Sequence, residues 1–248
     1  MNSRDSENLR TAASPFVEDR FGCGIQSAFL EVHARTQRPF PSFNPAAQEA
    51  LRAINHDIWQ ISVIVSRLEW SRAQVETGIL PQAIWCRYAE VDIESLLVQF
   101  RSILDYAART IEAFAPKRKQ LPLSFRSLRE NLDKYANRLP EGIEPLIRSA
   151  DWFDLCVKVR DEIVHGGGHP VVFPSKDEGT LFQVYGGAYQ RLIFLRSGMH
   201  NENVVRLDRY VAYMFGDSLA FLDMLGKLLM VKCQQPVGNG PTTTYCFG

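Results

Sequence analysis

The sequence predicts an all-α protein, an antiparallel bundle of long helices with a small β-hairpin or flap inserted before the last helix. Apolar residues recur every three or four positions over several long stretches, which is the period of an amphipathic helix. The connections between these stretches are short, and short connections favour antiparallel neighbours. Residues 170–196 depart from the helical period, because they are rich in β-forming residues and interrupted by proline and glycine.

The first long helix is predicted from residue 44 to about Glu76. Asn44 followed by Pro45 is typical of a helix cap with proline in the first turn. The pattern ends at Gly78. The apolar positions of this helix are Leu51, Ile54, Ile58, Ile61, Val65 and Leu68.

A second long helix is predicted to begin at Pro81 and to end at Pro116. The basic run 117–119 that follows is interpreted as a solvated helix end. The apolar stripe of this helix is Trp85, Tyr88, Val91, Leu96, Phe100, Ile103, Leu104, Ala107, Ile111 and Phe114.

Shorter helices follow in the middle of the chain. Ser124 is a candidate cap for a helix that runs through Leu139, and a short helical turn is expected around 145–148. Ser149 is a candidate cap for a further helix, 150–165. The expected core face of that helix is Trp152, Cys156, Val159 and Ile163.

The sequence pattern then changes from helix to strand and afterwards returns to helix. Within 170–196, three short segments are rich in β-formers, so a hairpin or three-stranded flap is predicted there. The last long helix is predicted from Asn203 to about Lys232.

This pattern divides the chain into one helical domain and two appendages. The domain spans 44–233 and includes the flap. Residues 1–43 form an N-terminal arm that is expected to be partly disordered, and 234–248 form a tail rich in glycine, proline and threonine that is expected to be flexible.

Composition excludes some classes of function. Lysine and arginine together number 28, as do aspartate and glutamate, so the formal net charge is zero. This balance argues against a protein that coats nucleic acid through bulk charge, but it allows an enzyme with a local basic cleft. The five cysteines are widely spaced and form no Cys-x-x-Cys pair, so neither a disulfide framework nor a zinc site is indicated. A reducing cytoplasm fits this usage best.

No membrane span or secretory signal is predicted. Residues 1–20 are polar and charged and lack the apolar core of a signal peptide. The most apolar stretch, Tyr210–Val231, contains Asp217, Asp223 and Lys227. A charged residue every turn or two indicates a buried helix rather than a membrane span.

The most informative stretch runs from Arg160 to His165 and continues into three glycines. Arginine holds a phosphate with a planar fork of donors, and histidine can take and return a proton near pH 7. The two together suffice, in principle, to cleave RNA without a metal. The alternative is structural: Arg160 pairs with a neighbouring carboxylate, and His165 caps the last carbonyls of its helix.

Helix geometry sets a condition on this pair. Residues five apart differ by roughly 140° around a regular helix, so Arg160 and His165 share no face unless the helix ends or distorts at Val164. Asp161 and Glu162 lie between them, and one of them could orient the arginine or the imidazole. The alternative for both carboxylates is a solvated helix edge.

The stretch resembles the Arg-x(4–6)-His motif of the HEPN superfamily, a group of small helical domains that includes many metal-independent RNases. Members often carry Asn, Asp or His directly after the arginine, and here that residue is Asp161. The resemblance extends over roughly 44–170 and the last helix. It implies a HEPN-like bundle, catalysis by Arg160, His165 and Asp161, and a homodimer in which two motif helices form one composite cleft.

Other residues are candidates for binding the substrate. Arg101, Asp105 and Arg109 lie four apart on one face of a helix, either as a solvated row of charges or as part of the cleft. We expect Arg101, Asp105 and His169 to contact the substrate. His165 and His169 are separated by three glycines and have no obvious third ligand nearby, so no metal or other cofactor is predicted.

Two functions follow from this sequence. The first is a metal-independent endoribonuclease with an RNA substrate, of a toxin or phage-defence kind as the resemblance implies, with an antitoxin or other protein as a possible partner. The alternative is a non-catalytic module that keeps the fold and holds a protein or a nucleotide. Burial of either motif side chain in the core favours the module, whereas convergence of two Arg160 and two His165 side chains on one cleft favours the enzyme.

Overall fold

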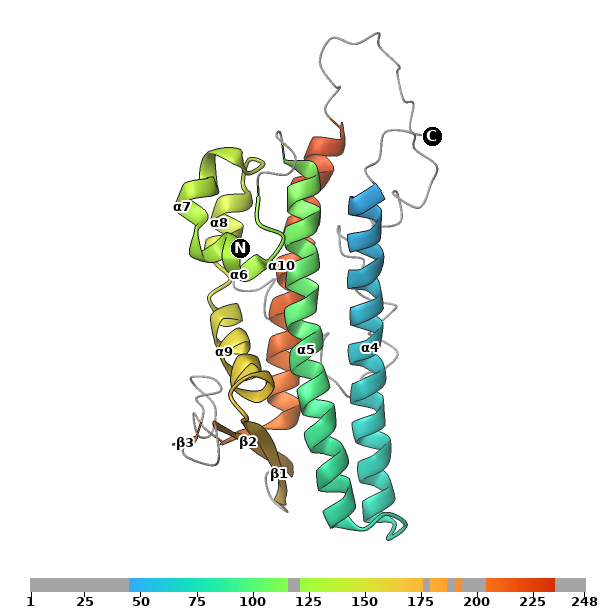
Figure 1. The fold of residues 1–248 in the computed structure, drawn as a ribbon. Helices are drawn as coiled ribbons and strands as arrows, with labels where there is room; N and C mark the ends of the chain where they lie inside the picture. Colours follow the sequence, from blue (N-terminus) through green and yellow to red (C-terminus); the bar gives the residue numbers. More distant parts are fainter. Residues whose placement is uncertain (1–44, 116–120, 176–178, 187–190, 193–203, 235–248) are drawn as a thin grey trace, which may run out of the picture.

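The computed structural model describes residues 45–115, 121–175, 179–186, 191–192 and 204–234. It is mostly helical with a small antiparallel sheet, as predicted (Figure 1). The long helices are α4 (Pro45–Glu76), α5 (Gln82–Phe114) and α10 (Leu207–Gln234). The shorter ones are α6 (Phe125–Glu130), α7 (Leu132–Tyr135), the 3-10 turn η1 (Ala136–Arg138), α8 (Ile143–Arg148) and α9 (Trp152–Val164).

Several predictions concern residues outside these ranges. They are the N-terminal arm 1–43, the cap at Asn44, the basic run 117–119 and the tail after Gln234.

Local signals place the ends of the α4–α5 hairpin where the sequence predicts them. Gly78 adopts a φ of 74° in the connection, a conformation that a residue with a Cβ atom rarely adopts. Tyr88 and Val91 are exposed, so their assignment to the core stripe was wrong. The buried positions in this part of α5 are Trp85, Ala89, Asp92 and Ile93, which lie on another face of the helix.

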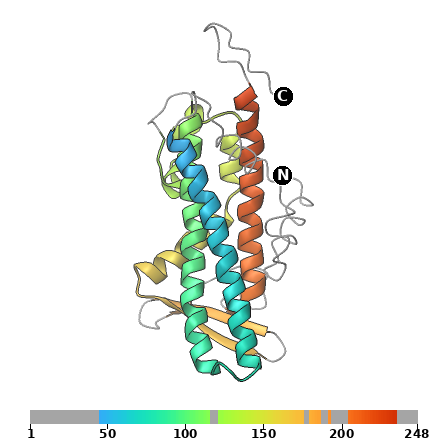
Figure 2. The same cartoon turned by 90° about the vertical axis from the view of Figure 1, so that its right-hand side faces the viewer.

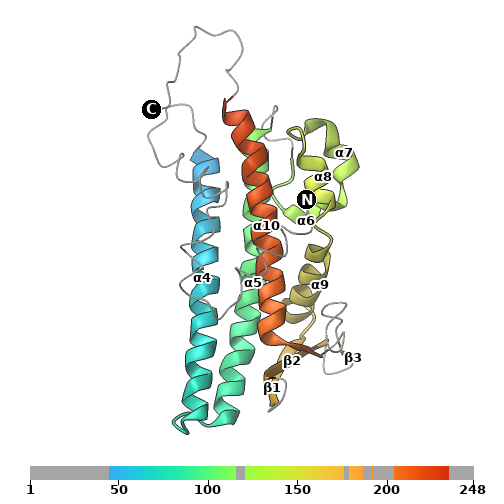
Figure 3. The same cartoon turned by 180° about the vertical axis from the view of Figure 1, so that it is seen from behind.

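The helices do not all alternate in direction. In Figure 1 the colours show that α4 and α9 run one way, while α5 and α10 run the other. The prediction of antiparallel neighbours therefore holds for α4 with α5 and for α5 with α9. It fails for α5 with α10, which lie side by side and parallel. The flap before α10 brings the chain back to the starting end of α5 (Figure 3).

The single helix predicted from Ser124 to Leu139 is broken into α6, α7 and η1. The break falls at Asn131, whose backbone leaves the helical region at φ −113° and ψ 26°. Ser124 makes no side-chain cap. Instead, Oδ1 of Asp105 on α5 accepts the hydrogen bond from the Phe125 backbone N–H at 2.9 Å, so a long-range contact fixes where α6 begins.

The start of α9 also differs from the prediction. Asp151 rather than Ser149 provides the cap, since its carboxylate accepts from the Trp152 backbone N–H at 2.9 Å. Ser149 donates its hydroxyl to the Leu146 carbonyl instead. Cys156 and Val159 are buried as predicted, whereas Trp152 and Ile163 are only partly buried against the core. The other buried positions of α9 are Phe153 and Val157.

The sheet confirms the flap and corrects its extent. Strands β1 (His169–Ser175) and β2 (Gly179–Gly186) form an antiparallel hairpin. On the other edge of β2, β3 (Arg191–Leu192) pairs at one end and β4 (Val204–Arg206) pairs at the other. The last helix was predicted from Asn203, but 204–206 pair with β2 and α10 begins only at Leu207.

A cluster of phenylalanines connects the short helices to the long ones. Phe125 of α6 is fully buried and meets Phe153 of α9 edge-on, with ring centroids 4.9 Å apart. It meets Phe221 of α10 in the same way at 5.3 Å. Edge-to-face geometry is favourable for aromatic rings, so this cluster fixes α9 against the bundle.

Within the described ranges, no helix combines enough length with enough apolar character to cross a membrane. The stretch Tyr210–Val231 lies in α10, where Asp217 and Ser218 are buried. The Ser218 hydroxyl donates to the Met214 carbonyl at 2.8 Å.

Candidate functional site

The run of glycines after His165 ends α9 and turns the chain into the sheet. His165 is the C-cap, with its backbone N–H donating to the Asp161 carbonyl at 2.9 Å. Gly167 has a φ of 69°. A Cβ atom on Gly168 would lie 2.6 Å from the Tyr185 carbonyl oxygen, so only glycine allows this close approach to β2.

Arg160 and His165 meet within one chain. Nη1 of Arg160 lies 3.1 Å from Nε2 of His165. The expected divergence of about 140° does not occur, because α9 ends at Val164 and His165 leaves the helical path. Arginine can only donate hydrogen bonds, so a hydrogen bond across this distance requires Nε2 as the acceptor, in the tautomer that carries its proton on Nδ1.

Asp161 is the centre of the charged cluster around this pair. Its Oδ1 accepts from Arg160 at 2.9 Å and from Arg101 of α5 at 3.2 Å. Its Oδ2 accepts from Arg126 of α6 at 2.8 Å. One carboxylate therefore holds together guanidinium groups from three helices and fixes their orientation at the end of α9.

The guanidinium of Arg160 is largely enclosed. The side chain is only 17% exposed, and its Nε is buried without a hydrogen-bond partner. Among the described residues, the Nε of Arg101 is likewise buried without a hydrogen-bond partner. The structural alternative raised by the sequence is therefore true in part, because Arg160 does pair with a neighbouring carboxylate.

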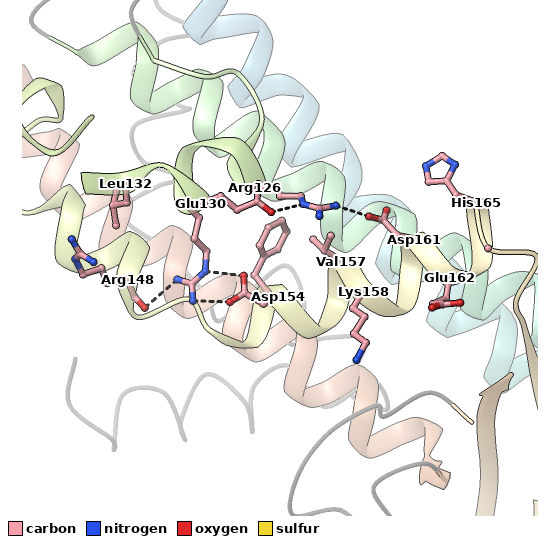
Figure 4. Close-up of a pocket in the computed structure, with 13 residues that line it drawn as sticks. Arg126, Glu130, Leu132, Arg148, Asp154, Val157, Lys158, Asp161, Glu162 and His165 are labelled. Carbon is pink, nitrogen blue, oxygen red and sulfur yellow. Dashed lines mark hydrogen bonds and ion pairs between the residues drawn. The ribbon is translucent and has the colours of Figure 1, made fainter. Parts of the chain in front are cut away.

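A groove with a volume of about 900 Å³ runs along α9 beside this cluster (Figure 4). One wall is α9 and the other is built by α6, α7 and α8. Lys158 lines it and has neither a hydrogen bond nor an ion pair among the described residues. The lining residues are Arg126, Arg129, Glu130, Leu132, Arg148, Phe153, Asp154, Val157, Lys158, Asp161, Glu162, His165 and Gly166.

The predicted site residues have different places relative to this groove. Asp161 and His165 line it, and Arg160 lies behind them in contact with both. Arg101 reaches Asp161 from α5 without lining the groove. His169 lies in β1, where its ring stacks on Tyr185 with centroids 6.2 Å apart, and it is not part of the lining.

Asp105 holds the beginning of α6. One of its oxygens accepts the backbone N–H of Phe125, and the other lies 3.7 Å from Nε of Arg101. Arg109, the next residue of the predicted row, lies over the Tyr106 ring at 5.1 Å. The three residues of this row therefore make different contacts and do not line the groove together.

Arg126, Arg129 and Lys158 line the groove but were not singled out from the sequence. Arg126 is shared between Asp161 and Glu130, and Arg129 holds Asp154 with two hydrogen bonds. The four-residue spacing of Arg126 and Glu130 indicates only a local pair. No local signal reveals that α6 lies over α9, because that placement depends on the phenylalanine cluster.

Cys156 lies beneath the cluster and is buried. Burial raises the pKa of its thiol to about 12, against a smaller opposing effect of Arg101. Since the thiolate is the nucleophilic form, Cys156 is a core residue rather than a reactive one. Among the residues described, no three His, Cys, Asp or Glu side chains are grouped so as to hold a metal ion.

Replacing Asp105 by alanine should lower the free energy of unfolding by about 1–2 kcal/mol, because the Phe125 N–H loses its acceptor at the start of α6. Urea denaturation measures this loss. The matched control is Asp105→Asn, which keeps an oxygen acceptor in place and should lose less than half as much. Equal losses in the two variants would contradict the capping role.

No protein-family model, curated protein or solved structure matches this chain.

Proposed function

We propose that this protein is a metal-independent endoribonuclease with a HEPN-like helical domain. The observation that supports this most is the 3.1 Å contact between Arg160 Nη1 and His165 Nε2 at the edge of a large groove. Phosphate binding and proton transfer are the two tasks of metal-free RNA cleavage, and this contact places one side chain suited to each beside the other.

In the proposed reaction the ribose 2′-oxygen attacks the adjacent phosphorus. His165 takes the 2′-hydroxyl proton, and the P–O bond to the 5′-oxygen of the next nucleotide breaks. The departing 5′-oxygen takes a proton from His165 or from water. The products are a 2′,3′-cyclic phosphate and a 5′-hydroxyl. Arg160 holds the phosphate and stabilises the negative charge that develops on it.

Substrate binding must first rearrange the pair. While Arg160 donates to Nε2, the lone pair that would accept a proton is occupied. Within the part of the chain that the structure describes, Arg160 makes no hydrogen bond through Nη2 or Nε. A phosphate in the groove can draw the guanidinium toward itself and free the imidazole. Asp161 would keep Arg160 in place during this change.

The groove suits an extended RNA strand. From Asp154 to His165 it follows α9 for 11 residues, or about 16 Å, which is the length of roughly five stacked nucleotides. Figure 4 shows Arg126 and Lys158 on the same side of His165, where they can contact phosphates farther along the strand. We place the enzyme among RNases of toxin or phage-defence type, for which an antitoxin or other protein is a fitting partner.

One observation favours a second candidate, a non-catalytic module that binds a protein or nucleotide. Arg160 is mostly enclosed and already paired with Asp161, as a residue with a structural task would be. In this alternative the groove still holds an anionic ligand, but His165 moves no proton.

The decisive measurement is RNA cleavage by the purified chain in the presence of EDTA. We expect cleavage to persist in the chelator and to leave 2′,3′-cyclic phosphate or 3′-phosphate ends, because the chemistry uses Arg160 and His165 alone. Analysis of the product ends by mass spectrometry checks this. Activity that vanishes in EDTA and returns with Mg²⁺ would sink the metal-free mechanism, and RNA binding without cleavage would favour the module.

A further inference from the structure

The groove extends to one side of the proposed catalytic pair. His165 and Gly166 line one end of it, and the lining then follows α9 back through Asp161 and Lys158 to Asp154. At 1.5 Å per residue, Lys158 lies about 10 Å and Asp154 about 16 Å from His165 along the helix axis. Figure 4 shows these residues in the same order. Among the residues that the structure describes, the groove thus begins at His165 and continues in one direction.

The sheet stands at the end of α9 where the groove begins. In Figures 1 and 2 the short helices α6–α8 lie toward the start of α9, and β1 and β2 lie toward its end. The Gly168 backbone packs closely against the Tyr185 carbonyl of β2, so no nucleotide fits between the glycine turn and the sheet. None of the described strand residues lines the groove. The contacts offered to a bound strand therefore lie along α9.

Two exposed cations follow His165 along the groove. Lys158 is exposed and makes neither a hydrogen bond nor an ion pair with another described residue. The side chain of Arg126 is 48% exposed, and it donates through Nε to Glu130 and through Nη1 to Asp161, both at 2.8 Å. Its Nη2 makes no hydrogen bond within the described ranges. Each cation can therefore bind a phosphate without first losing a partner.

Carboxylates also line the groove, but three of the four are held by arginines. Glu130 and Asp161 accept from Arg126, and Asp154 accepts two hydrogen bonds from Arg129. The repulsion that these carboxylates exert on a phosphate is therefore offset by the guanidinium that each one holds.

The order of the catalytic groups sets the direction of the strand. In phosphoryl transfer the attacking oxygen, the phosphorus and the leaving oxygen lie roughly in line. His165, which takes the proton of the attacking 2′-hydroxyl, stands at the beginning of the groove. The departing 5′-oxygen therefore points away from His165, toward Asp161 and Lys158, and takes its proton from water. This oxygen belongs to the nucleotide on the 3′ side of the cleaved bond.

We infer that the groove holds the 3′ side of the substrate, an inference that rests on the proposed function. The substrate class is single-stranded RNA that continues for about four nucleotides beyond the cleaved bond in the 3′ direction. Arg126 and Lys158 lie at roughly the levels of the second and third phosphates on that side. On the 5′ side the protein needs little more than the nucleotide that supplies the 2′-hydroxyl.

The test compares two twelve-nucleotide strands of 2′-O-methyl RNA that each keep a single 2′-hydroxyl, so that each has one cleavable bond. The bases around that bond are copied from a site that the protein cleaves in ordinary RNA. One strand has ten nucleotides on the 3′ side of the bond, and the other has ten on the 5′ side. We expect kcat/KM to be at least about tenfold higher for the first, because it keeps contacts with Arg126 and Lys158 that the second loses.

Lys158→Ala gives an independent readout through binding. The ligand is the same strand with every 2′-hydroxyl methylated, which has no cleavable bond. Removing one phosphate contact from a single strand should make the slope of log Kd against log salt concentration shallower by about 0.7. The matched control is Lys227→Ala on α10, which removes an exposed lysine outside the groove lining and should keep the wild-type slope.

Equal rates for the two strands, or a faster rate for the strand with the long 5′ side, would overturn the inference and leave the endoribonuclease proposal intact. An unchanged salt slope in Lys158→Ala would overturn it too, since Lys158 would then touch no phosphate. Cleavage of ordinary RNA without cleavage of either methylated strand would count equally against it, because the protein would then read flanking 2′-hydroxyls. If ordinary RNA is not cleaved at all, the proposed function fails and the inference fails with it.

Discussion

RNA cleavage by the His165→Ala variant should be slower than that of the wild type by roughly 10²–10⁴-fold, the usual loss when a general acid–base group is removed. The imidazole is exposed at the C-cap of α9, and among the described residues its one side-chain hydrogen bond is that of Nε2 with Arg160. The fold should therefore survive the change. Single-turnover cleavage of a labelled single-stranded RNA, together with thermal melting, measures both properties.

The partner of His165 should be as sensitive. Arg160→Ala removes phosphate positioning and charge stabilisation together, so its loss should be at least as large as that of His165→Ala. Arg160→Lys should fail as well, because a point charge cannot hold the carboxylate, the imidazole and a phosphate as a planar fork does.

Two variants on α4 serve as controls for this pair. His56→Ala and Arg52→Ala remove a histidine and an arginine that are exposed and outside the groove lining, so both should cleave RNA at the wild-type rate. If His165→Ala cleaves as fast as they do, the catalytic assignment is wrong. If His165→Ala unfolds instead, the residue is structural and the binding module is favoured.

Replacing Phe125 by alanine should cost about 3–5 kcal/mol of unfolding free energy, the typical loss for a fully buried phenylalanine. Its ring contacts Phe153 and Phe221 edge-on and is fully buried, so the change leaves a cavity where α6, α9 and α10 meet. Urea denaturation gives the loss directly.

The control for this variant lies two residues away. Leu123 is exposed, so Leu123→Ala should change the unfolding free energy by no more than about 0.5 kcal/mol. A loss below about 1.5 kcal/mol in Phe125→Ala would contradict the view that this cluster holds α9 in place.

The parts of the fold that could be predicted are those with local signals. Pro45, Gly78 and Pro81 mark the boundaries of α4 and α5 within the chain itself, and the boundaries agree with the structure. The break within 124–139 has no such signal, because α6 is capped by Asp105 from another helix. The strand at 204–206 was also missed, since it exists only through pairing with β2.

The candidate site likewise has residues that the sequence predicts and residues whose contacts depend on the tertiary structure. Arg160, Asp161 and His165 were located from their residue types, their spacing and the family resemblance, and Arg160 does contact the other two. Their convergence could not be predicted, because it depends on the conformation of His165 after the helix ends. Arg126 could not be found either, since its contact with Asp161 spans 35 residues and needs the tertiary packing of α6 on α9.

The position of Phe221 has a consequence for the order in which the protein matures on the ribosome. Phe125 and Phe221 are separated by 96 residues (221 − 125), so at roughly 5–20 residues per second the second ring is synthesised about 5–20 s after the first. The α4–α5 hairpin ends at Phe114, so it has been synthesised 107 residues (221 − 114) before Phe221. During the remaining interval the Phe125 ring lacks its neighbour from α10, and a nascent chain in that state offers a hydrophobic target to chaperones.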